Sequence, residues 1–220
     1  MPLPPFVILN SYRSIQCPAE TEIVVKKSRF IAQAAPANTP EAADAFVAAV
    51  RAKHPEARHN VWCYQLRGGQ KRYSDDGEPK GTAGIPVLGC LEHVAVLDCV
   101  LVVTRYFGGI LLGAPGLLRA YSQAAAAVLR DAHVCTMARC RDFALMLPYD
   151  CYGRALQLIA AERAVVFESQ FGEDVQLTVR TLAARADQLC DKLIDISNGK
   201  ARIGKIDERF VPWMDCEVGS

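Results

Sequence analysis

Three carboxylates lie close together in Ser74-Asp75-Asp76-Gly77-Glu78. Carboxylates this close can bind a hard cation or act as an acid and base pair. An EF-hand loop is not indicated, because it needs acids at alternate positions and a later glutamate. The segment can also contact base or ribose hydroxyls of an RNA. A turn is the simplest interpretation: the Asp side chains accept bonds from nearby backbone amides and Gly77 supplies a positive φ. We therefore predict that these five residues organise a loop, and we predict no metal.

Small residues follow at once in Lys80-Gly81-Thr82-Ala83-Gly84. Ahead of a helix start, such residues let backbone amides converge on an anion, and Lys80 could complete the site. The spacing of a Walker A loop is absent. A phosphate site that includes Lys80 and Thr82 and a plain turn are equally favoured.

A third loop follows the apolar run Cys99–Phe107, which ends in an arginine beside an aromatic residue. This pair suits phosphate binding and base stacking. Gly113-Ala114-Pro115-Gly116 then leads into the next helix. The candidate nucleic-acid or anion-binding residues are Lys80, Thr82, Arg105, Tyr106, Gly108, Gly109, Gly113, Arg119 and Tyr121. Alternatively, the glycines serve packing and the arginines pair with the acids of the first loop.

No arrangement of nucleophile and base is recognisable. The histidines His54, His59, His93 and His133 all lie away from these loops in sequence, and only His59 heads a predicted strand. We therefore expect no catalytic residues and no cofactor.

The composition is that of a soluble globular protein. The chain has 220 residues, 51% of them hydrophobic and 22% charged, with a net charge of +1, so any anion-binding surface must be local. Its nine cysteines are irregularly spaced and form no C-x-x-C pair, which favours free thiols in a reducing compartment. The N-terminus has neither a basic leader nor a long apolar run, so we expect a cytoplasmic protein without a membrane span.

The first part of the chain is predicted to mix strands and helices. Strands are expected at 12–15, 22–35, 59–66 and 99–107, the last being central because it is the most apolar. Lys26, Lys27 and Arg29 are placed on a solvated face of the second strand. A helix begins at Thr39-Pro40-Glu41 and stops before Pro55, and others are expected at 84–94 and 116–131.

The last part of the chain has the order β-α-β-β-α-β. Strands are expected at 142–149, 165–171, 174–180 and 201–210, with helices at 150–162 and 183–197. This order is typical of a ferredoxin-like domain. We therefore predict two domains, with a boundary near 132–141.

Four segments resemble the IMPACT/YigZ family: KKSRFIA, ARHNVWCYQL, YSDDGEPKGTAGIPVL and VLVVTRYFGGILLGAPGLLRAY. Residues 142–208 resemble the smaller C-terminal domain of its bacterial members. The resemblance implies an α+β chain with a ribosomal protein S5 domain 2-like domain at 1–135 and a ferredoxin-like domain at 140–210. Lys80 and Pro115 depart from the family pattern, where serine and glycine are common. Pro115 lacks a backbone donor, so a phosphate loop there is expected to be weakened.

The resemblance also implies a function. It points to RNA or ribosome binding with a role in regulating translation, and to no enzyme activity. One alternative is a protein-interaction module that acts through a partner in translational control. Another is an enzyme that binds a nucleotide or phosphate metabolite through Gly113–Gly116, because small-metabolite kinases share the S5-like fold.

Overall fold

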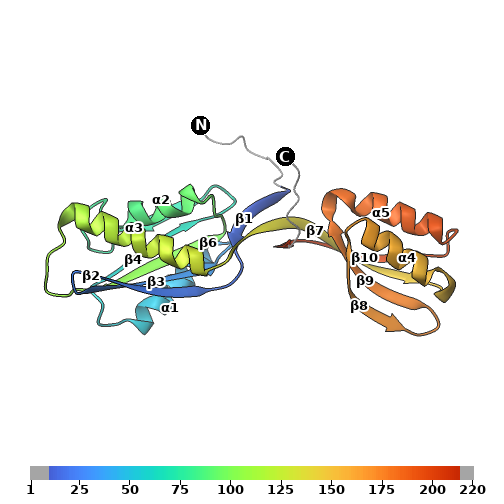
Figure 1. Cartoon of the computed structure of the whole chain (residues 1–220), viewed down its shortest axis with the longest axis horizontal. Helices are drawn as coiled ribbons and strands as arrows, with labels where there is room; N and C mark the ends of the chain where they lie inside the picture. Colours follow the sequence, from blue (N-terminus) through green and yellow to red (C-terminus); the bar gives the residue numbers. More distant parts are fainter. Residues whose placement is uncertain (1–9, 214–220) are drawn as a thin grey trace. The chain divides into compact units, whose positions relative to one another are not determined.

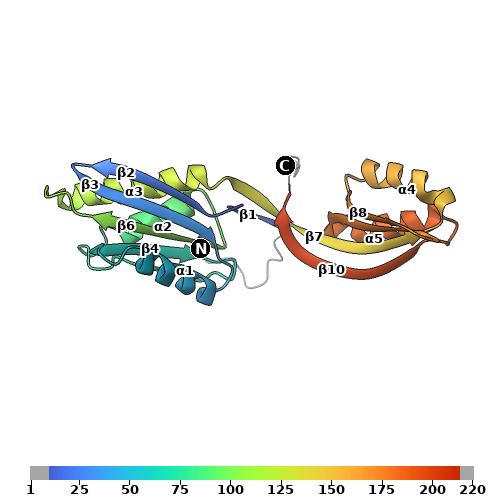
Figure 2. The same cartoon turned by 90° about the horizontal axis from the view of Figure 1, so that it is seen from below.

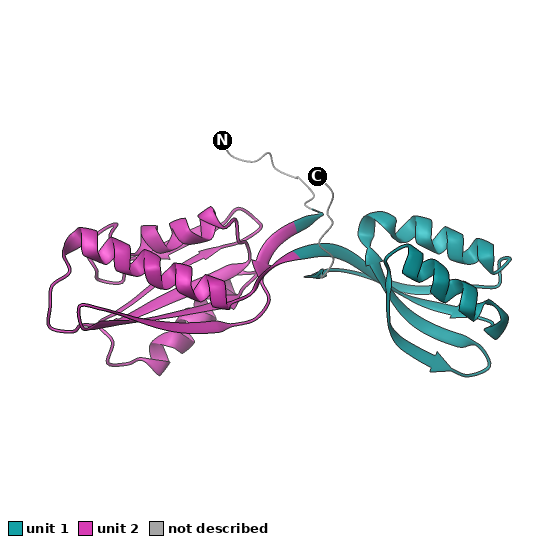
Figure 3. Ribbon diagram, in the orientation of Figure 1, with its two compact units in different colours: residues 1–11, 137–220 teal, residues 12–136 magenta. Residues whose placement is uncertain are grey.

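The computed structural model describes residues 10–213, whose elements are labelled in Figure 1. The chain divides into two compact units, drawn in different colours in Figure 3. We call residues 12–136 the N-terminal unit. The C-terminal unit comprises residues 137–213 together with Asn10 and Ser11. Strand β1 (Ser11–Ile15) opens the described chain, and the division between the units falls inside β7 (Val134–Leu147).

The N-terminal unit is built on an antiparallel sheet with the order β2-β3-β6-β4-β5. Strand β6 lies at its centre and all its residues except the last are buried, as the apolar sequence predicts. The strands are β2 (Ala19–Val25), β3 (Ser28–Pro36), β4 (His59–Gln65), β5 (Lys71–Ser74) and β6 (Cys99–Tyr106).

Helices cover both faces of this sheet. Helices α2 (Gly84–His93) and α3 (Gly113–Asp131) pack on one face and α1 (Pro40–Lys53) on the other (Figures 1 and 2). Helix α1 begins as predicted, with the Thr39 hydroxyl accepting a hydrogen bond from the Ala42 amide at 3.2 Å.

The predicted single strand over 22–35 is wrong. The segment is a hairpin of β2 and β3, in which Val25 pairs with Ser28 across a two-residue turn. Lys26 and Lys27 form that turn with φ values of 44° and 66°, and positive φ at both positions is typical of a type I′ turn. Asn and Gly are the usual residues there, so the lysines give no turn signal. They do not lie on a strand face.

Further differences from prediction are found at β5, at the start of α3, and at β7, which begins at Val134 and not at 142, so that much of the predicted boundary near 132–141 is strand. Strand β5 was not predicted, since it is only four residues long and exposed along most of its length. Helix α3 begins at Gly113, so Gly113-Ala114-Pro115-Gly116 is its first turn and not a loop ahead of it. Proline fits there because the first amides of a helix have no partner within the helix.

The C-terminal unit has the predicted ferredoxin-like fold. Its strands pair in the order β10-β7-β9-β8, all antiparallel, and its two helices pack on one face of the sheet. The remaining elements are α4 (Tyr149–Ala161), β8 (Val165–Phe171), β9 (Val175–Leu182), α5 (Ala183–Ile196) and β10 (Arg202–Pro212). Helix α5 ends as Asn198-Gly199 predicts: both residues have positive φ, and the Gly199 amide donates to the Ile194 carbonyl at 2.9 Å.

The cysteines within residues 10–213 are all free. Several are core residues, and burial raises the pKa of the Cys99 thiol to about 12 and that of Cys140 to about 11. Such thiols behave as small apolar side chains. Among these same residues, the helices are too short or too polar to cross a membrane.

Candidate functional site

The Asp75 carboxylate occupies the anion site that the sequence predicted at Lys80–Gly84. Its carboxylate accepts hydrogen bonds from the backbone amides of Gly81 at 2.8 Å, Ala83 at 3.1 Å and Gly84 at 2.7 Å. These are amides of the predicted phosphate loop, converging on an internal carboxylate at the start of α2. Thr82 is also turned inward, with its hydroxyl donating to the Pro79 carbonyl at 2.6 Å. A phosphate ligand for these amides and for Thr82 is therefore not supported.

Asp76 ties the same loop to β4 and α1. Its carboxylate accepts from the Asn60 amide at 2.6 Å and from Arg51 at 2.5 Å. Its carbonyl can only accept, so His59 Nδ1, 2.8 Å away, carries the proton that joins them. The turn needs positive φ at Asp76 (43°) and Gly77 (86°), and the Ser74 hydroxyl accepts from the Asp76 amide.

Glu78 is the acceptor of a buried polar network. One of its oxygens, Oε1, lies 2.6 Å from Arg105 Nη1 and 2.8 Å from the Tyr121 hydroxyl, with His59 Nε2 at 3.9 Å. Burial and the Glu78 charge raise the pKa of Tyr121 well above its usual value. The Arg105 guanidinium also lies 5.5 Å from the Phe30 ring centre and 5.7 Å from that of Phe107. The network joins the acidic loop, β6 and α3.

Direct contact of Arg105 and Tyr121 with RNA is contradicted by their burial. Arg105 is 6% exposed and Tyr121 has no exposed surface, so neither can meet a phosphate or stack on a base. Both side chains point into the unit, towards Glu78. Tyr106 is partly exposed to solvent. Its hydroxyl lies 3.0 Å from His54 Nδ1, and the guanidinium of Arg29 lies beside its ring. For Arg105, the alternative that the arginines pair with the acids of the first loop is therefore the one observed, with Glu78 as the partner.

The three acids do not converge on one point, since each engages its own partners. Within residues 10–213, no group of His, Cys, Asp or Glu side chains could hold a metal ion. The acids instead fasten the loop to its surroundings, which is the role of loop-organising residues.

The exposed part of the third loop lies against the β2–β3 turn (Figures 1 and 2). A Cβ added to Gly108 would lie 2.0 Å from the backbone carbon of Lys27, so only glycine fits there. The Gly108 amide also donates to the Ser28 hydroxyl at 3.1 Å. The β2–β3 turn and the loop after β6 are far apart in sequence. Their contact brings Lys26 and Lys27 next to the predicted anion-binding loop.

This contact creates an exposed surface that is both basic and apolar. We call Lys26, Lys27, Phe107, Ile110 and Leu111 the basic tip. Both lysines are exposed, Phe107 is 47% exposed and Leu111 is 83% exposed. Neither lysine has an ion-pair partner in the described part of the chain, whereas the nearby Arg29 is held by two 2.9 Å bonds to Glu22.

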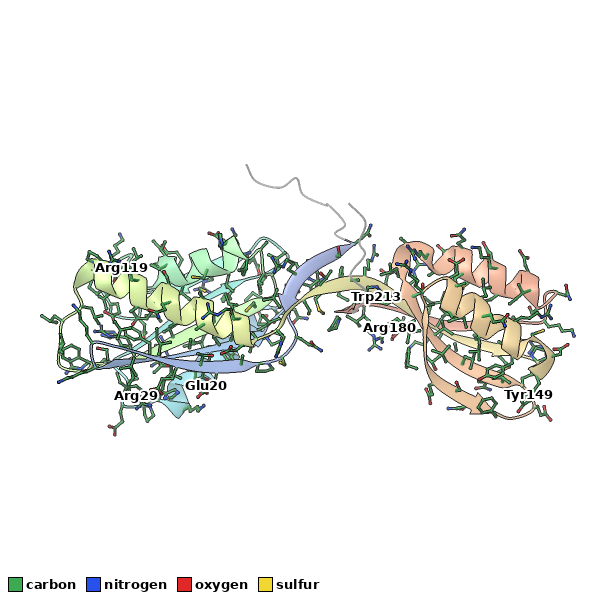
Figure 4. All side chains as sticks on the ribbon, viewed as in Figure 1. Glu20, Arg29, Arg119, Tyr149, Arg180 and Trp213 are labelled. Atoms are coloured by element: carbon green, nitrogen blue, oxygen red, sulfur yellow. The ribbon has the colours of Figure 1, made fainter. Side chains whose placement is uncertain are left out.

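Two predicted cations remain available outside the basic tip. Arg119, labelled in Figure 4, projects from α3 into solvent, and Lys80 is exposed on the acidic loop. Neither makes an ion pair with another described residue. Gly109 and Gly113 have φ values of 81° and 71°, so they shape the loop backbone between β6 and α3.

The chain was compared with known proteins. Residues 26–129 match the Impact N-terminal domain, and residues 145–200 match a domain of unknown function, DUF1949. The IMPACT family member YigZ of Escherichia coli is 37% identical over 84% of this chain and 92% of its own length. This chain belongs to the IMPACT family. The family and the α+β fold inferred from the sequence are therefore confirmed.

Other IMPACT family relatives agree. The member YvyE of Bacillus subtilis is 31% identical over 89% of this chain and 91% of its own length. A Thermus thermophilus member is 38% identical over 80% and 97%. A crystal structure of a hypothetical protein has a TM-score of 0.60 at 34% identity, covering 91% of this chain and 99% of its own. None of these names states an activity.

Proposed function

We propose that this IMPACT family protein is a non-enzymatic, cytoplasmic RNA- or ribosome-binding protein that acts in the regulation of translation. The supporting observation is the contact of Gly108 with Lys27, which places two unpaired lysines beside the exposed Phe107 ring. Cations that neutralise phosphates and an aromatic face on which a base can stack are the two parts of a single-strand RNA surface.

Arg119 and Lys80 are further exposed cations without an ion-pair partner among the described residues, and Tyr106, Gly108, Gly109 and Gly113 position the loop of the basic tip. The buried network of Glu78, Arg105 and Tyr121 acts indirectly, because it holds the strand and helix on either side of that loop. With a net charge of only +1, binding depends on these local groups.

The test is the salt dependence of binding. Labelled single-stranded RNA is titrated with the purified chain by fluorescence anisotropy at several KCl concentrations, and ribosome co-sedimentation is measured in parallel. Lys26→Asn/Lys27→Gly removes both charges and supplies the residues that a type I′ turn favours, so the fold is kept. We expect weaker binding and a log–log salt slope that is smaller by about 1.4, from two lost phosphate contacts on a single strand.

A matched control removes two exposed, unpaired cations elsewhere. Arg202→Gln/Lys205→Gln on β10 changes the net charge by the same amount and should leave RNA binding unchanged. Equal effects of the two double variants would show that charge alone, and not the basic tip, drives binding. If neither RNA nor ribosomes bind the original chain at low salt, the proposal fails.

A protein-interaction module is the second candidate. The exposed side chains of Ile110 and Leu111 favour it. Leu111 is 83% exposed, and exposed aliphatic side chains are typical of surfaces that bind other proteins and contribute little to RNA binding. Binding of a protein partner captured from lysate through this surface should persist at high salt. It should also be lost in Ile110→Ser/Leu111→Ser but retained in the double lysine variant.

The alternative of a phosphate-metabolite enzyme gains no support from the loop geometry. Gly113–Gly116 is a helical turn, and Asp75 and Glu78 are engaged internally. A thermal-shift screen with nucleotides and Mg²⁺ is its test, since a ligand at a hundred times its Kd would stabilise the fold by about 2.7 kcal/mol.

A further inference from the structure

A pocket of about 570 Å³ lies in the N-terminal unit between α2 and α3. This volume is typical of small-molecule sites. Its walls are mainly apolar and include Pro86, Val94, Ala126, Leu129 and Val134. It shares no residue with the acidic loop or with the basic tip.

Small side chains keep this pocket open. Gly89 lines it from within α2, and a Cβ added there would meet no atom within 4 Å. Glycine destabilises a helix interior relative to alanine, and packing does not require it here. Cys90 and Ser122 join the two helices beside it, the thiol donating to the Ser122 carbonyl at 3.6 Å. The backbone at Gly89 therefore faces open space in the pocket.

The polar lining of the pocket includes two arginines, both exposed, and one histidine. Arg13, His93 and Arg130 line it, and no carboxylate does. Neither arginine has an ion-pair partner in the described part of the chain. The acids next to His93 and Arg130 in sequence are engaged elsewhere: Glu92 pairs with Lys71 at 2.6 Å, and Asp131 accepts a hydrogen bond from the Thr21 hydroxyl. The pocket therefore combines an apolar interior with uncompensated positive charge.

We propose that this pocket binds an aliphatic carboxylate. Its chain lies along the apolar walls of α2 and α3, past Gly89, and its carboxylate meets the guanidinium groups of Arg13 and Arg130. Arginine suits this head group because its planar donors match the two carboxylate oxygens. The site is independent of the proposed RNA surface.

Dodecanoate and its uncharged analogue dodecanol are the probes, each titrated into the full chain by calorimetry below its limit of self-association. We expect 1:1 binding of dodecanoate, and binding of dodecanol weaker by about a hundredfold, from about tenfold for the charge-assisted hydrogen bond at each of the two arginines. Arg130→Gln removes one of these two bonds, so it should reduce dodecanoate affinity about tenfold and leave dodecanol affinity unchanged.

Two substitutions of Gly89 separate binding from folding. Gly89→Leu projects a branched side chain into the pocket and should weaken binding strongly, whereas Gly89→Ala adds one methyl group, raises helix propensity and should retain binding. Circular dichroism and thermal melting confirm that both variants are folded. The proposal is overturned by an absence of dodecanoate binding, by equal affinity for dodecanol, or by full binding to a folded Gly89→Leu variant.

Discussion

Replacing Glu78 by glutamine should destabilise the N-terminal unit severely. Glutamine keeps the shape and one oxygen acceptor for Arg105 and Tyr121, but it removes the charge that balances the guanidinium of Arg105, a residue only 6% exposed. Removing one partner of a buried ion pair typically costs 3–5 kcal/mol. Because the hydrogen bonds can persist in part, we expect about 3 kcal/mol for Glu78→Gln.

The assay is urea unfolding followed by the fluorescence of Trp62, which lies on β4 in the N-terminal unit. Trp213→Phe removes the other tryptophan, so that the signal reports one unit. The midpoint should fall without a change in the m-value. Arg51→Gln is the control, since its pair with Asp76 is largely exposed on the arginine side and should contribute less than about 1 kcal/mol.

The double variant Glu78→Gln/Arg105→Gln tests the cause of the loss. With both charges removed, no uncompensated ion remains, so the double variant should be more stable than the sum of the two single losses by about 1–3 kcal/mol. If Glu78→Gln costs less than about 1 kcal/mol, or if the two losses simply add, the network does not depend on the ion pair and our reasoning is refuted.

Three further predictions concern the loop, the thiols and the C-terminal unit. Gly108→Ala should separate the loop from the β2–β3 turn and weaken RNA binding. In Gly109→Ala the added methyl group meets no neighbour, so the variant should lose only about 1–2 kcal/mol of stability through backbone strain. Thermal melting would compare the stability of the two variants, and fluorescence anisotropy their RNA binding. Mapping of alkylated cysteines at pH 8 should find the exposed Cys17 modified. The buried Cys99, with its raised pKa, should stay protected until the protein unfolds. Equal alkylation rates for the two thiols would contradict the burial of Cys99 in the core. Hydrogen bonds from Arg180 and Arg209 lower the pKa of Asp142, so its contribution to stability is present above its unfolded pKa of about 3.9 and is lost as pH falls through the folded value. Asp142→Asn should therefore flatten the acid side of the stability profile of the C-terminal unit, read from Trp213; an unchanged profile would contradict this.

Elements with strong periodicity or clear end signals could be predicted from the sequence. Helix α1 has a capping threonine and a proline in its first turn, and β6 is apolar throughout, so both were placed nearly correctly. The β2–β3 turn was missed because two lysines occupy positions that normally carry Asn and Gly. Local propensity cannot reveal a turn whose strain is compensated by the pairing of its flanking strands.

The candidate site was only partly predictable. The turn at Asp76-Gly77, with its positive φ at Gly77, could be predicted because turn chemistry is local in sequence. The burial of Arg105 and Tyr121 could not, because it depends on Glu78 reaching two elements that lie 27 and 43 residues further along the chain. Lys27 was missed for the same reason, since its contact with Gly108 spans a distance in sequence that no motif records.

The position of β6 also sets an order of events during synthesis. The hairpins β2–β3 and β4–β5 are each local, but they do not pair with one another; β6 joins them, with Phe30 and His59 both opposite Arg105. When only the two hairpins have emerged from the ribosome, the edges of β3 and β4 that later pair with β6 are therefore unpaired. Such edges are templates for wrong pairing. Until Cys99–Tyr106 leaves the ribosome, this half of the chain cannot close its sheet.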